Sequence, residues 1–173
     1  MDDHYEIQET GVKVLLDDLG IRTDLDLRSN GKPVLDQKLV QWIQAPIEAY
    51  DAITDHEWVV GYRTAFKTLA DSSNYPILVH CWGGADRTGT LMFLLGGLLG
   101  MKWDDLVRDY ELTSRSAVGT RSHLSEDFTR FAAAIGSFKD DSADQNFQGI
   151  VERYLLWVGL DGDDIRSIRS ILL

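Results

Sequence analysis

Apolar residues recur with two periods in the first part of the chain, one typical of helices and one typical of strands. Residues 7–19 carry apolar side chains at roughly helical spacing, and Gly20 is placed to end a helix there. The stretch TDLDLR, residues 23–28, alternates leucine with charged residues, which predicts a strand, and SNGKP after it predicts a turn. The pattern further favours a second strand over 39–47, a polar loop over 50–56 and a helix over 58–70.

The middle of the chain predicts a buried strand followed by helices. Pro76 introduces ILVHC, which has no polar face and therefore predicts a strand in the centre of a parallel sheet. Residues 88–99 are apolar all round, which indicates a buried helix. Further helices are predicted over 103–112, 125–138 with Ser125 as N-cap, 147–158 and 163–172, with Gly159 and Gly162 between the last two.

This order of elements predicts the fold class. Strands and helices alternate early and helices cluster late, so we expect an α/β protein. Its central, mostly parallel sheet would have about four or five strands with helices on both faces, and its C-terminal part would be helical. The 173 residues are the length of one domain, so a single domain is expected over 1–173.

The composition of the chain restricts the kinds of partner that it can bind. The formal net charge of −11 repels nucleic acid and anionic membranes, so any anionic ligand must be held by a local positive site. The longest apolar run, 91–101, is shorter than the ~20 residues of a membrane helix, so no stable membrane insertion is expected. The first residues lack a signal-peptide pattern, which predicts a cytoplasmic protein as given, or a secreted or periplasmic one if a leader was removed.

The chain has one cysteine, Cys81, which excludes an internal disulfide and a cysteine-based zinc site. It is either a buried small hydrophobe or a reactive thiol. Around it, residues 79–89 read VHCWGGADRTG. Three glycines allow the backbone to curl so that N–H groups surround an anion, and the following helix adds its positive end. Arg87 can grip two phosphoryl oxygens, and this setting favours a thiolate at Cys81. The plainer interpretation is a core cysteine and a surface arginine.

The segment HCWGGADRTGT resembles the signature loop H-C-x5-R-S/T of the cysteine-dependent protein tyrosine phosphatase superfamily. Its Asp-Arg-Thr-Gly ending is similar to the bacterial atypical branch of tyrosine and lipid phosphatases, as are LGIRTDLDLRS upstream and DYELTSRS over 109–116. The chain begins later than such relatives, which predicts a fragment or a shortened member. The resemblance implies a phosphate-binding loop of Trp82, Gly83, Gly84, Ala85, Asp86, Arg87 and Thr88.

The same resemblance implies a mechanism through a phosphocysteine, with no metal and no cofactor. Cys81 would attack phosphorus, and Arg87 would bind the phosphoryl group and stabilise the transition state. The Thr88 hydroxyl would stabilise the thiolate when it leaves, and His80 would hold the loop by hydrogen bonds.

Two aspartates are candidates for the general acid that protonates the leaving group. Many relatives carry this acid on a mobile loop about thirty residues before the cysteine, where this chain has Asp51, with Asp55 close behind. Some branches with an Asp-Arg-Thr ending use the loop aspartate, here Asp86, which we favour slightly. The alternatives are an ordinary acidic loop for Asp51 and Asp55, and a loop-bracing acceptor for Asp86.

We therefore expect a phosphate monoester hydrolase that acts on phosphorylated protein or a small phosphate ester, phosphotyrosine first, with dual specificity possible. An inositol-phosphate or phosphoinositide phosphatase is the alternative, although Trp82 and Ala85 stand where such relatives often carry lysines. A catalytically silent phospho-binding module is the alternative of another class.

Some further side chains leave two interpretations open. Arg28 ends a predicted strand, at the edge where ligands bind, but it also fits a structural ion pair. Arg115, Arg121 and His123 fit a solvated loop, or contact a second anionic group. Trp82 could stack on an aryl ring or pack outward.

Overall fold

A small parallel sheet forms the centre of the fold. The computed structural model describes residues 8–140 and 146–173, and within them the strands pair in the order β2–β1–β3. The α/β class with a parallel sheet is confirmed, with three strands in the described residues where the sequence predicted four or five. The bounds of the strands are β1 (Thr23–Asp26), β2 (Gln41–Gln44) and β3 (Ile77–His80).

The apolar strand β3 lies at an edge of this three-stranded sheet, so the prediction that it would be central is wrong. The central strand is β1, all of whose residues are buried. Both faces of β3 are nevertheless covered, because Val79 packs into the core while Leu78 lines a cavity with Leu15 and Val34 on the other face. An apolar strand without a polar face therefore indicates that both of its faces are covered. An edge strand, which has only one neighbouring strand, can meet this condition.

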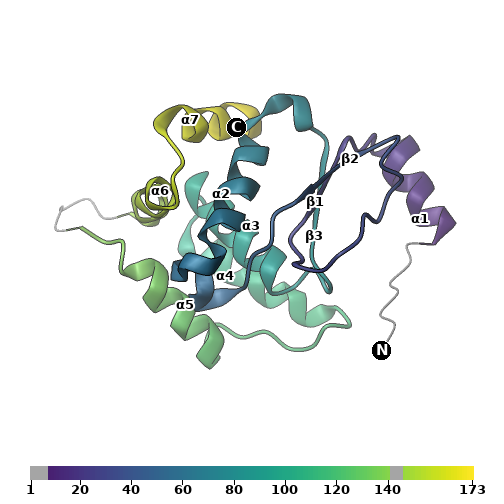
Figure 1. Cartoon of the computed structure of the whole chain (residues 1–173). Helices are drawn as coiled ribbons and strands as arrows, with labels where there is room; N and C mark the ends of the chain where they lie inside the picture. Colours follow the sequence, from purple (N-terminus) through teal and green to yellow (C-terminus); the bar gives the residue numbers. More distant parts are fainter. Residues whose placement is uncertain (1–7, 141–145) are drawn as a thin grey trace.

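Helices cover the two faces of the sheet unequally (Figure 1). α1 (Glu9–Lys13) and the π-helical turn η1 (Val14–Asp18) lie on one side of the strands, whereas all the later α-helices lie on the other. These are α2 (His56–Ala70), α3 (Arg87–Leu98), α4 (Trp103–Leu112), α5 (Glu126–Gly136), α6 (Phe147–Val158) and α7 (Gly162–Leu172).

The connections also contain short helical turns, which are η2 (Tyr50–Thr54), η3 (Ser72–Asn74) and η4 (Thr113–Arg115). The predicted polar loop over 50–56 is thus a 3-10 helix at η2, because Ile53 is buried and anchors it to the core. The helical C-terminal part is confirmed, and Ser125 caps α5 as predicted, since its side chain accepts a hydrogen bond from the Phe128 N–H.

The buried helix α3 is surrounded by the sheet and by α4, α5 and α6. Its Phe93 makes edge-on aromatic contacts, with ring centroids 5.3 to 5.8 Å apart, to Trp103, Phe128, Phe131 and Phe147. Such contacts stabilise the packing beyond their buried area. They fix α3 so that its N-terminal end lies at the C-terminal edge of the parallel strands, where α/β proteins bind ligands.

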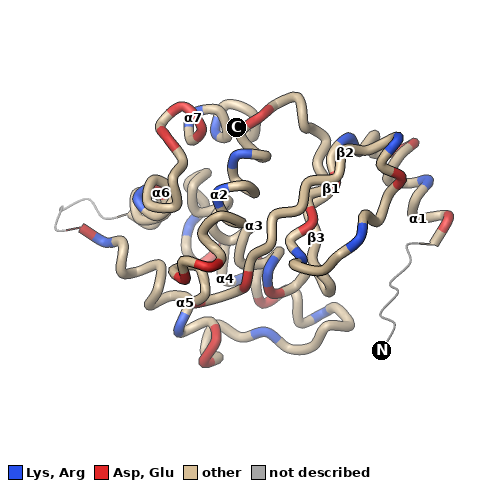
Figure 2. Tube along the Cα trace, in the orientation of Figure 1, with Lys and Arg blue, Asp and Glu red and all other residues tan. Residues whose placement is uncertain are grey.

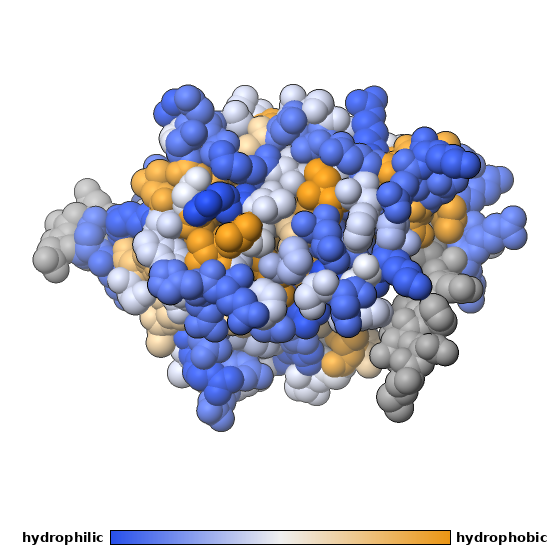
Figure 3. All heavy atoms as spheres, in the orientation of Figure 1, coloured by the Kyte–Doolittle hydropathy of each residue, from blue (hydrophilic) through white to orange (hydrophobic). Residues whose placement is uncertain are grey.

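The outer surface is mostly hydrophilic. Figure 3 shows hydrophilic residues over most of the visible face with small, separate hydrophobic patches, and Figure 2 shows acidic and basic positions interleaved along the chain. Within the part of the chain that the structure describes, no helix is long and apolar enough to span a membrane. The apolar run 91–101 lies mainly in the buried helix α3.

Candidate active site

The loop between β3 and α3 brings a thiol and a guanidinium to one helix end. Cys81 follows the last residue of β3, and Arg87 is the first residue of α3. Gly84 has φ +70°, a left-handed conformation that favours glycine, and a Cβ on Gly83 would lie 2.9 Å from Cγ1 of Val118. The loop therefore turns tightly at the N-terminal end of α3, where the helix dipole and backbone N–H groups favour an anion.

Arg87 is held in a fixed orientation by Glu48. Its Nε donates to Oε1 of Glu48 at 3.0 Å, and its Nη2 donates to Oε2 at 3.1 Å. The hydrogen bonds to Glu48 raise the pKa of Arg87 and outweigh burial, which lowers it. One edge of the guanidinium is thus taken by a carboxylate, and in the described residues Nη1 has no acceptor. That nitrogen remains available to an anion in the loop.

Thr88 carries a hydroxyl that the fold leaves unsatisfied. Its Oγ1 is buried and has no hydrogen-bond partner among the residues that the structure describes. Buried polar atoms are usually paired, and an exception beside the Cys81 loop calls for an explanation. The position of Thr88, directly after Arg87 in the first turn of α3, places this donor at the same helix end.

The two candidate acids have different surroundings. Asp86 lies in the loop, and its carboxylate accepts hydrogen bonds from the Tyr50 hydroxyl at 2.5 Å and from Arg121 Nε and Nη2 at 2.9 and 3.0 Å. Asp51 lies in η2, half-exposed, and its Oδ2 is 3.4 Å from Nε of Arg130 on α5. Asp86 is therefore part of the same loop as Cys81, whereas Asp51 lies outside this loop and pairs with Arg130 on α5.

His80, the last residue of β3, connects the loop to the buried carboxylate of Asp24 in β1, on the face of the sheet that η1 covers. Its Nε2 lies 2.8 Å from Oδ1 of Asp24, whose side chain is 1% exposed, and its Nδ1 lies 3.2 Å from the carbonyl oxygen of Cys81. Burial lowers the pKa of His80, but the hydrogen bond and charge of Asp24 outweigh it, so the pKa is raised overall. An imidazolium donates from both nitrogens, which fits both contacts.

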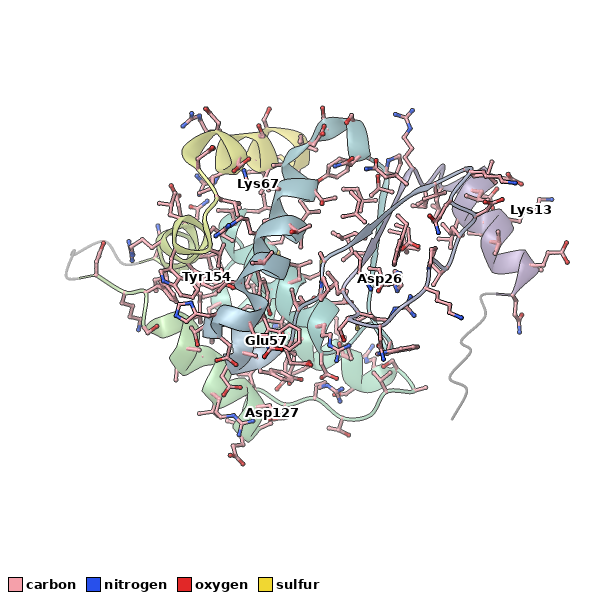
Figure 4. All side chains as sticks on the ribbon, viewed as in Figure 1. Lys13, Asp26, Glu57, Lys67, Asp127 and Tyr154 are labelled. Carbon is pink, nitrogen blue, oxygen red and sulfur yellow. The ribbon has the colours of Figure 1, made fainter. Side chains whose placement is uncertain are left out.

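A second buried pair lies beside the first. Arg28 donates through Nε and Nη2 to both oxygens of Asp26, each at 2.7 Å, and Figure 4 shows Asp26 within the sheet. Burial raises the pKa of Asp26, but the hydrogen bonds from Arg28 outweigh it and lower the pKa overall. Arg28 also lies 4.7 Å from the ring centroid of Trp82, a cation–π distance. The structure thus shows the ion-pair alternative for Arg28 and places Trp82 against it.

Replacing Asp24 with asparagine is expected to lower stability in a pH-dependent way. Because the pKa of His80 is raised in the folded state, the pair stabilises the fold most below about pH 6.5, and its contribution is lost as pH rises through the folded pKa. Breaking a buried pair costs about 3 kcal/mol. Chemical denaturation of Asp24→Asn and of the unchanged protein should show the largest difference near pH 6 and a smaller one at pH 9. A difference independent of pH would contradict this assignment.

The polar stretch after η4 reaches the loop through the side chain of Arg121 as well as through Val118. Arg121 pairs with Asp86, and its side chain is only 18% exposed, so the expectation of a solvated position is wrong for this residue. His123 instead pairs with Glu111 through Nδ1 at 2.6 Å, on the exposed surface. Arg115 is exposed. The difference arises because Asp86 supplies a carboxylate within reach of Arg121.

Sequence reasoning missed Glu48 and Tyr50 as neighbours of the loop. Both follow β2 at the C-terminal edge of the sheet, so their place after a parallel strand was a signal. That signal alone does not separate them from other polar residues of the same connection.

Comparisons with known proteins bear on the family of the chain. The model of the tyrosine phosphatase family matches residues 1–173. The Kluyveromyces lactis protein named "Putative tyrosine-protein phosphatase OCA1" is 33% identical to the chain over 70 residues. The matched stretch covers 40% of this chain and 31% of that relative, less than a third of its length.

Proposed function

The chain belongs to the tyrosine phosphatase family, and we propose that it hydrolyses phosphate monoesters through a phosphocysteine at Cys81. The observation that carries the proposal is the loop from Cys81 to Arg87, which puts the thiol and the guanidinium at the N-terminal end of α3. In the first step Sγ of Cys81 attacks phosphorus, the S–P bond forms, and the P–O bond to the leaving group breaks. Arg87 stabilises the phosphoryl oxygens with the edge that Glu48 leaves available.

One aspartate donates a proton in the first step and takes one up in the second, and we propose Asp86 for this role. It would give its proton to the leaving oxygen in the first step. In the second step water attacks phosphorus, the S–P bond breaks, and the carboxylate takes the proton of that water. The place of Asp86 inside the loop supports this role, whereas the alternative acid, Asp51, lies outside the loop in η2. The unpartnered hydroxyl of Thr88 would stabilise the departing thiolate.

Phosphotyrosine in a protein or peptide is the proposed substrate. Three arginines near the loop, Arg28, Arg87 and Arg121, are each paired with a carboxylate of the same chain, so little positive charge is left for additional phosphates. Trp82 is 40% exposed beside the nucleophile, which suits an apolar or aromatic leaving group better than a highly charged one. These observations favour a single phosphate monoester over a multiply phosphorylated inositol.

A phosphate-release panel tests the substrate. We expect the highest kcat/KM on a phosphotyrosyl peptide, a lower value on the matched phosphoseryl peptide, and the lowest on multiply phosphorylated inositols. The Cys81→Ser protein, assayed beside it, gives the background. Fastest release from inositol phosphates would replace the proposed substrate with the alternative one. Phosphate binding without release from any substrate would indicate a silent binding module.

A further inference from the structure

Tyr50 reaches the catalytic loop with a strained backbone. It has φ +60°, and it is the one non-glycine residue with a positive φ among residues 8–140 and 146–173. Its N–H donates to Oγ1 of Thr90 at 3.2 Å, and its hydroxyl donates to Oδ1 of Asp86 at 2.5 Å. A bulky residue adopts this conformation only where its surroundings impose it, and such outliers gather at functional sites. The strain at Tyr50 is therefore associated with its contact to Asp86.

Arg121 approaches the same carboxylate from another segment. Its backbone is fixed by Ser114, whose Oγ accepts from the Arg121 N–H at 2.8 Å and donates to the Arg121 carbonyl oxygen at 3.0 Å. Its guanidinium then makes two hydrogen bonds to Asp86, one to each oxygen. Charge-assisted bidentate pairs of this kind set geometry as well as energy. Asp86 is thus held by donors from two segments that are distant in sequence.

We propose that Tyr50 and Arg121 are positioning residues that orient Asp86 for proton transfer and stabilise its carboxylate once the proton has left. The inference rests on the proposed function of Asp86. Among the residues that the structure describes, the side chains that hydrogen-bond to the Asp86 carboxylate are all donors, so the observed arrangement matches the state after the leaving group has been protonated. In this state the carboxylate is ready to take a proton from the water that attacks the phosphocysteine.

Tyr110 and a neighbouring cavity offer hydrogen-bond partners to Tyr50 and Asp86 when Asp86 is protonated. The hydroxyls of Tyr50 and Tyr110 are 3.4 Å apart, and either can donate. When Asp86 carries its proton on Oδ2, Tyr50 still donates to Oδ1 and can accept from Tyr110, so the proton stays available for the leaving group. A cavity of about 290 Å³ beside them admits water, and Tyr50, Asp86, Tyr110 and Arg121 are part of its lining.

The test separates orientation of the acid from general damage. Variants Tyr50→Phe and Arg121→Gln are compared on 4-nitrophenyl phosphate and phenyl phosphate, which differ in how much the leaving oxygen needs a proton. General acids contribute about 10²-fold or more, so we expect kcat/KM on phenyl phosphate to fall at least about tenfold in each variant. On 4-nitrophenyl phosphate we expect a fall of less than about threefold, since its phenol leaves without help.

Matched controls lie elsewhere on the same molecule. Tyr75→Phe removes a hydroxyl that donates to the Leu69 carbonyl, and Arg130→Gln removes the partner of Asp51. Neither should change the ratio of the two substrates. Arg121→Lys keeps the charge but has one nitrogen in place of the planar fork, so it should retain more of the phenyl phosphate activity than Arg121→Gln. Thermal unfolding of each variant shows whether it folds.

The outcomes distinguish failure of this inference from failure of the proposed function. Asp86→Asn and Asp51→Asn are measured on the same two substrates. Suppose that Asp86→Asn lowers kcat/KM selectively on phenyl phosphate, while Tyr50→Phe and Arg121→Gln lower kcat/KM equally on both substrates or on neither. The positioning role is then overturned, and the function of Asp86 stands. If Asp51→Asn shows the selective loss instead, Asp86 is not the acid, and the positioning role falls with it.

Discussion

Replacing Cys81 with serine is expected to abolish phosphate release and to leave the binding of inorganic phosphate close to that of the unchanged protein. A serine hydroxyl is a much weaker nucleophile than a thiolate and a poorer leaving group in the second step, so turnover should fall more than about 10⁴-fold. The anion site itself keeps Arg87, the loop backbone and the N-terminal end of α3. The exchange of one atom, sulfur for oxygen, is therefore expected to remove turnover and to keep phosphate binding.

Phosphate release from 4-nitrophenyl phosphate measures the turnover, calorimetry with inorganic phosphate measures the binding, and thermal unfolding checks the fold. Because Cys81 is the one cysteine of the sequence, a thiol reagent on the unchanged protein supplies an independent control. Activity should fall in proportion to the labelled thiol, and phosphate should protect it. Hydrolysis by Cys81→Ser within about tenfold of the unchanged protein would contradict the covalent mechanism.

The loop could be predicted from the sequence because its parts are contiguous. Strand end, thiol, glycines, arginine and buried helix follow one another within residues 77–98, and the local backbone fixes their relation. The helical elements were predictable for the same reason, since their periodicity is local. The partners of the loop were not, because Glu48, Tyr50 and Arg121 meet it across separations of 39, 36 and 35 residues.

Burial of charge was also beyond sequence reasoning. The alternation in residues 23–28 is typical of a strand with one face in water, yet Asp24 and Asp26 are 1% and 0% exposed. They are buried because His80 and Arg28 supply donors on the same face and because η1 and the connection after β1 cover it. A polar position in a strand therefore does not distinguish solvent from a buried ion pair.

Replacing Arg87 with lysine is expected to lower turnover at least about a hundredfold, the scale of one lost transition-state donor. The guanidinium does two things at once, since Nε and Nη2 bind Glu48 while Nη1 is available to the phosphoryl group. Lysine keeps the charge but has one nitrogen on a flexible stem, so a lysine that binds Glu48 is drawn away from the phosphate. The loss should appear mainly in kcat, because the transition state carries the charge that the guanidinium stabilises.

The control is Arg108→Lys, a substitution of the same kind at an exposed position of α4, which should leave kcat unchanged. Glu48→Gln separates the two functions of the guanidinium, since it keeps acceptor and shape but removes the charge that fixes Arg87. We expect it to lower kcat less than Arg87→Lys does, because the guanidinium of Arg87 remains and keeps Nη1 for the phosphoryl group. A loss below about tenfold in Arg87→Lys would mean that Arg87 does not contact the transferred phosphoryl group, and that Glu48 pairs with it for stability alone.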